Sequence, residues 1–357
     1  MDAQEQLHRY LQVLIKNDGS DLHIKAGSKA HIRKSGEMLP IGQHPLSDEE
    51  VISLARVILT DEQYERLQTE KEFDRSYSID HTARFRTNFF YQFNGLSMIM
   101  RRISSRVPTL EELQLPESLK EMVTLQKGMI LITGATGSGK STTAASLIDI
   151  INRRYRRHII TIEDPIEYLF TEEKCLISQR AIGENSLSYD RALKAAFRED
   201  FDVLFVGEIR NLETLKTAMH AANTGHLVLS TMHTKGSVET IARIINLFPP
   251  EEHQQVRLSL AQTLIGIVSQ QLVKSLDGTL IPAVEILKNT SRIAELIATS
   301  RDTEILDAIA KNHTTYGMQT LDQSLLGWYN QGRISREVVL AAAHSPSDMQ
   351  LRISGVH

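Results

Sequence analysis

The chain has 357 residues, of which 41% are hydrophobic and 24% are charged, and its formal net charge is -4. This length accommodates two or three domains, and the composition is typical of globular proteins. A mildly acidic chain is a poor general binder of nucleic acids, because that affinity depends mostly on Lys and Arg that neutralise phosphates; a local basic groove is still compatible with it. The single cysteine, Cys175, excludes an internal disulfide and a cysteine-based zinc cluster.

The N-terminal sequence lacks a basic segment followed by an apolar core, which is the pattern of a signal peptide. No apolar run approaches the roughly 20 residues that a helix needs to span a bilayer. A single cysteine also suits a reducing compartment. We therefore expect a cytoplasmic protein without an integral membrane segment, whose membrane contacts go through a partner or a surface patch.

Residues 1–103 combine helical and strand patterns and predict a small α/β domain. Three leucines at helical spacing predict an amphipathic helix over residues 2–17. Residues 20–39 alternate apolar and polar side chains around glycine turns, which is typical of short strands. A second helix is expected to begin after Ser47, because Glu50 stands where its side chain can complete a capping box.

Residues 83–103 predict two paired strands joined at Asn94–Gly95, a strong hairpin signal. Residues 104–116 contain two prolines and little periodicity, and we interpret them as a connector between domains.

The second domain, residues 117–285, carries the pattern of a parallel sheet that is buried on both faces. A strand leads into a glycine-rich loop and then into a helix from about Lys140 to Ile151. Ligands bind at the carboxyl ends of the strands in such sheets, and the predicted strands all end in polar residues. These strands are residues 128–133, 158–164, 202–208 and 226–233.

The chain is expected to become helical after residue 250. One apolar stripe predicts a core helix that runs past residue 264. A strand over residues 279–287 follows, and residues 286–357 predict short helices that form a C-terminal helical bundle. The stripe consists of Val256, Leu260, Leu264, Ile267 and Val268.

The segment Gly134-Ala135-Thr136-Gly137-Ser138-Gly139-Lys140-Ser141-Thr142 matches the phosphate-binding P-loop pattern. Its glycines let the backbone curl so that several N–H groups point at phosphate oxygens, and the following helix adds a favourable dipole. Lys140 is expected to reach the β- and γ-phosphates of ATP, and Ser141 to supply a hydroxyl to Mg²⁺. The segment stands between a predicted strand and a predicted helix, which is the context that the motif requires.

Acidic residues follow two of the other predicted strands. Glu208 comes after Gly207 with no adjacent aspartate, so we expect it to serve the metal shell, the attacking water, or both. Glu163 and Asp164 point in opposite directions along an extended chain, so only one is expected to face the phosphates. We favour Glu163 for the site, to orient water or metal, and Asp164 for structure; a capping role for both is the alternative.

His226 and His233 stand seven residues apart at the two ends of one predicted strand, so they are expected at opposite ends and on opposite faces. His233, at the carboxyl end, is placed to donate a hydrogen bond to the γ-phosphate, although a strand-end histidine commonly has a structural role only.

Phosphoryl transfer also needs positive charge, which arginine fingers often supply across a subunit boundary. Candidates within the second domain are Arg198 and Arg210, which flank the strand before Glu208. The first domain offers four more on its predicted hairpin: Arg84, Arg86, Arg101 and Arg102.

Read together, these motifs resemble the secretion ATPases that power type II and type IV secretion and type IV pili. The family's aspartate box corresponds to "TIEDPIEY", its Walker B strand to "VGEIR" and its histidine box to "TGHLVLSTMHT". The similarity covers essentially the whole chain, from "SDLHIKAG" through "ARFRTN", "CLISQR" and "RIINLFPPEE" to "YGMQTLDQSLL", and is strongest to pilus retraction ATPases of the PilT type.

This resemblance implies an α/β fold with a PAS-like N-terminal domain, a RecA-like P-loop ATPase domain and a C-terminal helical bundle. It implies a cytoplasmic homohexamer with active sites between subunits, peripheral at the inner membrane through a pilus platform protein. By the same resemblance, Glu163, Glu208, His226 and His233 match positions in the family's boxes. Arg86 and Arg101 match first-domain arginines that reach bound nucleotide.

The sequence departs from the retraction pattern in two places. Where retraction ATPases usually carry "AIRNL", this chain has "RIAEL", with Ala294 and Glu295 in place of Arg and Asn. This leaves an accessory, PilU-like paralogue as an alternative, beside pilus assembly or secretion, a nucleic-acid motor, and a scaffold that binds ATP without turning it over. Phe201 replaces a proline of the family's "REDPD" segment.

Overall fold

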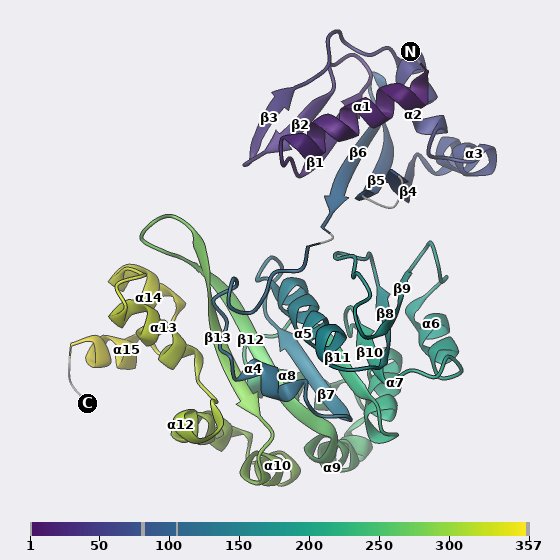
Figure 1. Ribbon diagram of the computed structural model, residues 1–357. Helices are drawn as coiled ribbons and strands as arrows, with labels where there is room; N and C mark the ends of the chain where they lie inside the picture. Colours follow the sequence, from purple (N-terminus) through teal and green to yellow (C-terminus); the bar gives the residue numbers. More distant parts are fainter. Residues whose placement is uncertain (1, 80–82, 105, 355–357) are drawn as a thin grey trace. The chain divides into compact units, whose positions relative to one another are not determined.

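The computed structural model describes residues 2–79, 83–104 and 106–354 (Figure 1). The chain forms two compact units that divide between residues 105 and 106. Each is described by itself. Residue 105, which belongs to the predicted connector, lies outside the described residues.

The first unit is a six-stranded antiparallel sheet in the order β3-β2-β1-β6-β5-β4. One face of this sheet packs against three helices around a core that includes Leu22, Phe85 and Phe89. The strands are β1 (Asp21–Lys25), β2 (His31–Lys34), β3 (Glu37–Pro40), β4 (Glu72–Ile79), β5 (Ala83–Gln92) and β6 (Gly95–Ile103), and the helices are α1 (Ala3–Lys16), α2 (Asp48–Arg56) and α3 (Asp61–Glu70).

Local sequence signals account for much of this unit. The Ser47 side chain accepts from the Glu50 N–H and the Glu50 carboxylate accepts from the Ser47 N–H, so the predicted capping box at the start of α2 is confirmed. The predicted hairpin is β5–β6, but Gln92 pairs with Gly95, so the two turn residues are Phe93 and Asn94. Gly95 itself adopts a φ of 116°, which favours glycine.

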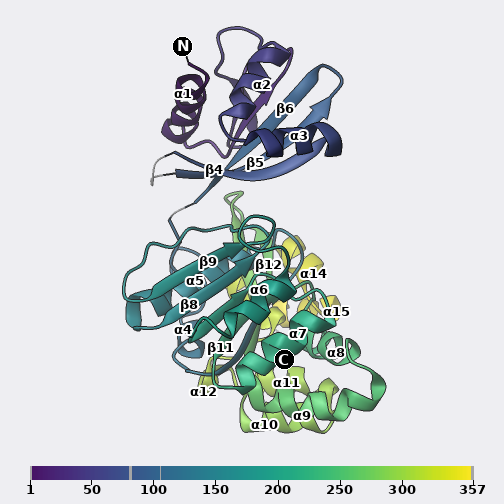
Figure 2. The ribbon, with the colours of Figure 1, turned by 90° about the vertical axis from the view of Figure 1, so that its right-hand side faces the viewer.

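The second unit is built on a seven-stranded sheet in the order β13-β12-β7-β11-β10-β8-β9 (Figure 1). Figure 2 shows β8 and β9 side by side at one edge of this sheet. All neighbours in this sheet are parallel except β12 and β13. The strands are β7 (Gly128–Thr133), β8 (His158–Glu163), β9 (Leu176–Ala181), β10 (Val203–Val206), β11 (Leu227–Met232), β12 (Leu264–Lys274) and β13 (Leu280–Lys288).

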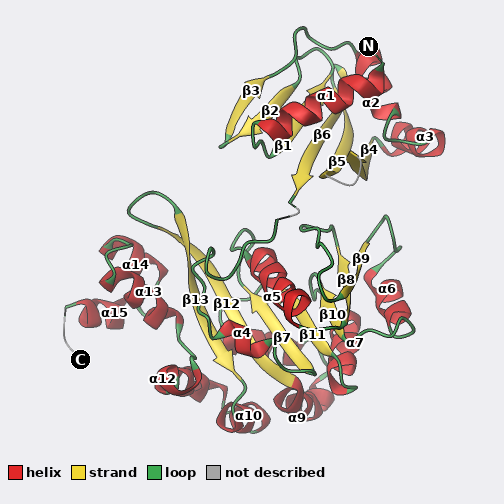
Figure 3. Ribbon diagram, viewed as in Figure 1, coloured by secondary structure: helices red, strands yellow, loops and turns green. Residues whose placement is uncertain are grey.

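Helices cover both faces of this sheet (Figure 3), which is why its central strands are buried almost along their whole length and are largely apolar. On one face lie α4 (Leu119–Met122) and α5 (Lys140–Arg154). The other face carries α6 (Tyr189–Ala196), α7 (Leu212–Asn223), α8 (Ser237–Asn246), α9 (His253–Thr263), α10 (Ser291–Ala298) and α11 (Ile305–Lys311).

The last helices pack on the end of the β12–β13 pair around Val273, Ile281 and Leu325. They are α13 (Leu321–Asn330), α14 (Arg336–Ala342) and α15 (Pro346–Ile353). The short helix α12 (His313–Tyr316) precedes them and lies outside this cluster. Residues Leu110 and Leu115 of the predicted connector are buried with α4 and α5. None of the described helices combines the length and the apolar character that a membrane span requires.

The prediction that the core helix continues beyond residue 264 is wrong. Helix α9 ends at Thr263, and Leu264, Ile267 and Val268 belong to strand β12. The segment is rich in apolar and β-branched residues and is buried between β7 and β13, so its spacing fits a strand buried on both faces as well as a helix. Pairing with two neighbouring strands decides the outcome.

We expect Phe85→Ala to lower the stability of the first unit by about 3–5 kcal/mol, because this fully buried ring leaves a cavity. Phe93→Ala is the matched control, since Phe93 at the hairpin turn is fully exposed. Native-state hydrogen exchange of β5 and β6 amides measures the difference. Equal protection in the two variants would contradict the described core.

Candidate functional site

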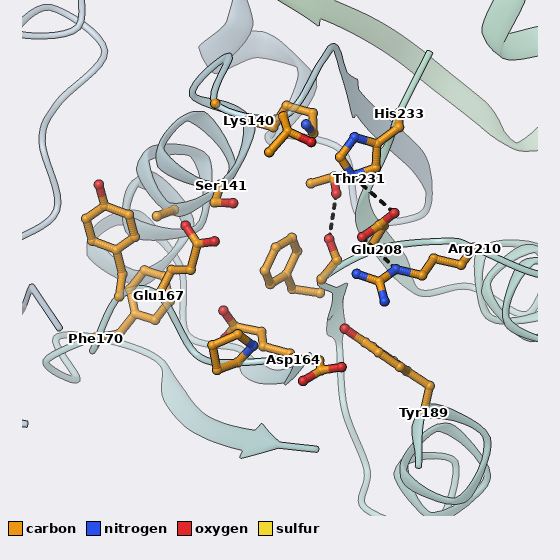
Figure 4. A pocket seen from close by; sticks show the side chains of 18 residues that line it. Lys140, Ser141, Asp164, Glu167, Phe170, Tyr189, Glu208, Arg210, Thr231 and His233 are labelled. Atoms are coloured by element: carbon orange, nitrogen blue, oxygen red, sulfur yellow. Dashed lines mark hydrogen bonds and ion pairs between the residues drawn. The ribbon is translucent and has the colours of Figure 1, made fainter. Parts of the chain in front are cut away.

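A cavity of about 290 Å³ opens where β7, β8, β10 and β11 end, at the carboxyl edge of the parallel sheet (Figure 4). The predicted P-loop and the predicted acidic strand ends meet there. The residues that line it are Thr136, Gly137, Lys140, Ser141, Ala145, Glu163, Asp164, Pro165, Glu167, Tyr168, Phe170, Tyr189, Phe205, Gly207, Glu208, Arg210, Thr231 and His233.

The P-loop connects β7 to α5, and Gly139 stands before the helix with a φ of 85°. The ammonium group of Lys140 donates to the carbonyl oxygens of Gly134 at 3.0 Å and Ala135 at 2.8 Å. Burial lowers the pKa of Lys140, while the nearby carboxylates of Glu208 and Glu167 oppose that shift. The loop therefore presents a cation to the cavity from a partly desolvated position.

Glu208 lies between two cationic or ionisable partners (Figure 4). One carboxylate oxygen accepts from Nε of Arg210 at 2.9 Å, and the other lies 3.2 Å from Nε2 of His233. The ion pair with Glu208 raises the pKa of Arg210. Strands β10 and β11 are neighbours, which explains why a residue after one reaches a residue after the other. Glu208 is thereby held in one orientation toward the cavity.

Glu163 is the last residue of β8 and is almost completely buried. Its carboxylate accepts from the Thr161 hydroxyl at 2.7 Å. Burial raises the pKa of Glu163 to about 7, and the Thr161 hydrogen bond only partly offsets this. Asp164 lines the same cavity. Which of the two carboxylates faces the phosphates stays a prediction.

The structure places the other predicted P-loop residues in different surroundings. Gly134 and Ala135 line a second cavity, on the side of the C-terminal helices. The Thr142 hydroxyl lies 3.0 Å from the hydroxyl of Tyr168. Ser138 and Gly139 line neither cavity. Their nucleotide contacts stay a prediction.

His226 does not line this cavity, and its assignment as a nucleotide contact stays a prediction. It precedes β11, at the end opposite His233, and its ring lies 4.3 Å from that of Phe201 between centroids. Its Nδ1 lies 3.1 Å from the Ala221 carbonyl oxygen. Phe201, which replaces the family's proline, is buried here and packs against His226.

Arg86 and Arg101 belong to the first unit, where they stand directly opposite each other on β5 and β6. Arg101 Nε donates to the buried carboxylate of Asp21 at 2.8 Å, and Arg86 Nε lies 3.9 Å from Asp74. Their contact with nucleotide stays a prediction. Arg198 follows α6 and does not line the cavity.

Several cavity residues were not identified from the sequence, among them Tyr189 and Thr231. Tyr189 is the first residue of α6, and its pKa is raised mainly by burial. Thr231 donates to the Gly207 carbonyl oxygen at 2.6 Å and so ties β11 to the turn before Glu208. Thr231 was detectable as a polar residue near a strand end, whereas no local signal marks Tyr189.

Among the described residues, no three His, Cys, Asp or Glu side chains converge as metal ligands. The available oxygen donors are the Ser141 hydroxyl and the carboxylates that line the cavity. These suit Mg²⁺ bound together with phosphate oxygens. The assignment of the metal to Ser141 and Glu208 stays a prediction.

The family described as "Type II/IV secretion system protein" matches residues 3–325. The chain belongs to this family.

Two relatives from Pseudomonas aeruginosa match nearly the whole chain. The type IV pilus retraction ATPase PilT is 40% identical over 333 residues, which cover 93% of this chain and 96% of PilT. The type IV pilus ATPase PilU is 39% identical over 349 residues, covering 98% and 91%. The crystal structure of the pilus retraction motor PilT with bound ADP superimposes with a TM-score of 0.88 at 38% identity, covering 95% of this chain and 97% of that one.

The raised pKa of Glu163 predicts a pH dependence of stability. The unfolded chain loses this proton near 4.5 and the folded chain near 7, so the folded state binds more protons in this window. The contribution of Glu163 to the free energy of unfolding therefore falls as pH rises from 4.5 to 7, by on the order of 3 kcal/mol.

Denaturant unfolding of the wild type and of Glu163→Gln across this range tests the prediction. The variant removes the titration, so the difference in unfolding free energy between the two proteins should change with pH and level off above about 7. A difference that is constant from pH 4.5 to 8 would rule out a raised pKa.

Proposed function

We propose that this protein is a Mg²⁺-dependent P-loop ATPase that works as a hexameric motor and drives type IV pilus retraction. The observation that carries the proposal is the meeting of Lys140 and Ser141 with Glu208, held by Arg210 and His233, in one cavity. This arrangement combines a phosphate cradle with a carboxylate fixed at its edge.

The P-loop residues bind and orient the substrate. The backbone N–H groups of the loop donate to the phosphates of ATP, and the ammonium of Lys140 neutralises part of their charge. When ATP binds, Lys140 exchanges its hydrogen bonds to the Gly134 and Ala135 carbonyl oxygens for contacts with the phosphates. Ser141 and Glu208 would hold Mg²⁺, with Glu208 acting through water. Bound Mg²⁺ supplies positive charge to the β- and γ-phosphate oxygens.

Glu208 is the best placed residue to accept a proton from the attacking water, because its two neighbours fix its orientation. In this proposal, His233 donates a hydrogen bond to the γ-phosphate. Glu163, with its pKa near neutrality, is a second candidate to orient water. Arg86 and Arg101 would supply positive charge to a nucleotide at a subunit boundary, as the family resemblance implies.

The relatives support the biological role. PilT is named as a pilus retraction ATPase, and a twitching motility protein of Neisseria gonorrhoeae is 40% identical over 319 residues. In this proposal the hexamer lies in the cytoplasm and acts on a pilus platform protein in the inner membrane. ATP turnover would change how neighbouring units are held across the nucleotide.

An accessory, PilU-like role is the second candidate. PilU matches the chain at almost the same identity as PilT. The segment that departs from the retraction pattern lies in α10, where Glu295 pairs with Arg292 and Arg301 in place of the expected asparagine. Pilus assembly, secretion, a nucleic-acid motor and a non-hydrolysing scaffold are the remaining alternatives.

We expect Lys140→Ala to abolish ATP turnover by weakening phosphate binding, and Glu208→Gln to retain binding while lowering turnover about 100-fold or more. Phosphate release and binding of a fluorescent ATP analogue separate the two effects. Lys127→Ala, at an exposed position before β7, is the control. Normal turnover by Lys140→Ala in a folded protein would remove the P-loop from the mechanism.

Deletion of the gene tests the direction of work. Loss of a retraction motor should give hyperpiliated cells that do not twitch, because pili still extend. Pilus counts by electron microscopy and a twitching assay measure this, with wild-type and Lys140→Ala complementation as controls. Cells without pili would indicate an assembly role, and hyperpiliation only when a second retraction gene is also deleted would indicate an accessory role.

A further inference from the structure

Gln270 reaches the P-loop from a strand that the motif does not include. It lies on β12, the neighbour of β7 on the side away from the acidic strand ends, and it is buried. Its Oε1 accepts from the Thr143 hydroxyl at 2.7 Å, and its Nε2 donates to the Ser138 carbonyl oxygen at 2.8 Å. One carboxamide thus joins the end of the loop to the first turn of α5.

Chemistry fixes the orientation of this carboxamide. The Ser138 carbonyl oxygen can only accept, so the amide nitrogen must face it, and the amide oxygen is then left for the Thr143 hydroxyl. Thr143 is fully buried and Ser138 nearly so. If either hydrogen bond is lost, a buried polar group is left without a partner, because water cannot reach it. An unsatisfied buried group of this kind destabilises the folded protein.

Two P-loop glycines lie so close to Gln270 that neither leaves room for a side chain. A Cβ on Gly134 would stand 2.2 Å from the Gln270 carbonyl oxygen, and a Cβ on Gly139 would stand 2.7 Å from Nε2 of Gln270. Gly134 has a φ of 143° and Gly139 a φ of 85°. Gln270 therefore contacts the loop at both of its ends, with its backbone at one and its side chain at the other.

From this geometry we infer that Gln270 is a positioning residue that sets the conformation of the P-loop for nucleotide binding. The inference rests on the proposed nucleotide function of the loop. Gln270 does not line the cavity that holds Lys140 and Glu208; it lines the second cavity, beside the C-terminal helices. Its effect on the phosphates is therefore indirect, through Ser138 and Thr143.

Ser269, the residue before Gln270 on β12, also contacts a loop at the edge of the site. Ser269 accepts from the Gly236 N–H at 2.8 Å, three residues after His233. On β13, Glu285 accepts from the N–H of Ser237 at 2.6 Å. Consecutive residues of β12 thus hold the P-loop and the loop that follows His233.

The test compares Gln270→Met with Gln271→Met in the full-length protein. Methionine keeps the length of the side chain but removes both hydrogen bonds, and Gln271 donates one comparable bond to the Ala342 carbonyl oxygen away from the P-loop. We expect Gln270→Met to raise the Kd for a fluorescent ATP analogue, and the KM for ATP, by about 10-fold or more relative to Gln271→Met. Gln270→Met leaves two buried polar groups without partners, so its thermal midpoint should be lower than that of Gln271→Met, and binding is compared at a temperature at which both variants are folded.

A second pair keeps the inference testable if Gln270→Met fails to fold. Thr143→Val removes only the hydroxyl that Gln270 accepts from, and Thr143→Ser restores a hydroxyl at the same place. We expect Thr143→Val to weaken analogue binding and Thr143→Ser to recover it, which a purely structural loss of packing would not produce.

The outcomes distinguish the positioning role of Gln270 from the proposed ATPase function. If the wild type binds the analogue and Gln270→Met binds it as tightly as Gln271→Met, the positioning role is wrong and the proposed ATPase function stands. The same holds if Thr143→Val and Thr143→Ser bind alike. If the wild type itself does not bind ATP or its analogue, the proposed function fails, and the inference falls with it.

Discussion

The parallel alignment of β7, β8, β10 and β11 is the constraint on which the site depends. Parallel strands end at the same edge of a sheet, so the residues that follow each strand converge there whatever their distance in sequence. Lys140, Glu163, Glu208 and His233 meet in this way. The helices on both faces keep these strands dry and fixed, which lets charged side chains stand at the edge in defined orientations.

Electrostatics at this edge is arranged around two carboxylates in different surroundings. Glu208 is held by Arg210 and His233, so its charge is compensated and its direction is set. Glu163 is buried with one hydroxyl donor, and its pKa rises toward neutrality. Under the proposed function, these surroundings favour Glu208 as the base that accepts a proton from water, with Glu163 as a second candidate to orient that water.

Much of this organisation was predictable because it is local. The capping box at Ser47, the β5–β6 hairpin and the P-loop between β7 and α5 each follow from a few adjacent residues. The failure at β12 was non-local, because the stripe after Leu260 fits a helix and a buried strand equally well and only pairing with β7 and β13 decides between them.

The sequence by itself determined the glycine-rich loop between β7 and α5, the strands β7, β8, β10, β11 and β13, and the acidic residues at the strand ends, because these depend on spacing along the chain. Only the tertiary structure decided that residues 264–274 form β12, that Tyr189 and Thr231 line the cavity and that Gln270 supports the loop. These features depend on which strands become neighbours. The pairing of strands depends on how the whole sheet is buried, so it cannot be read from any short segment of the sequence.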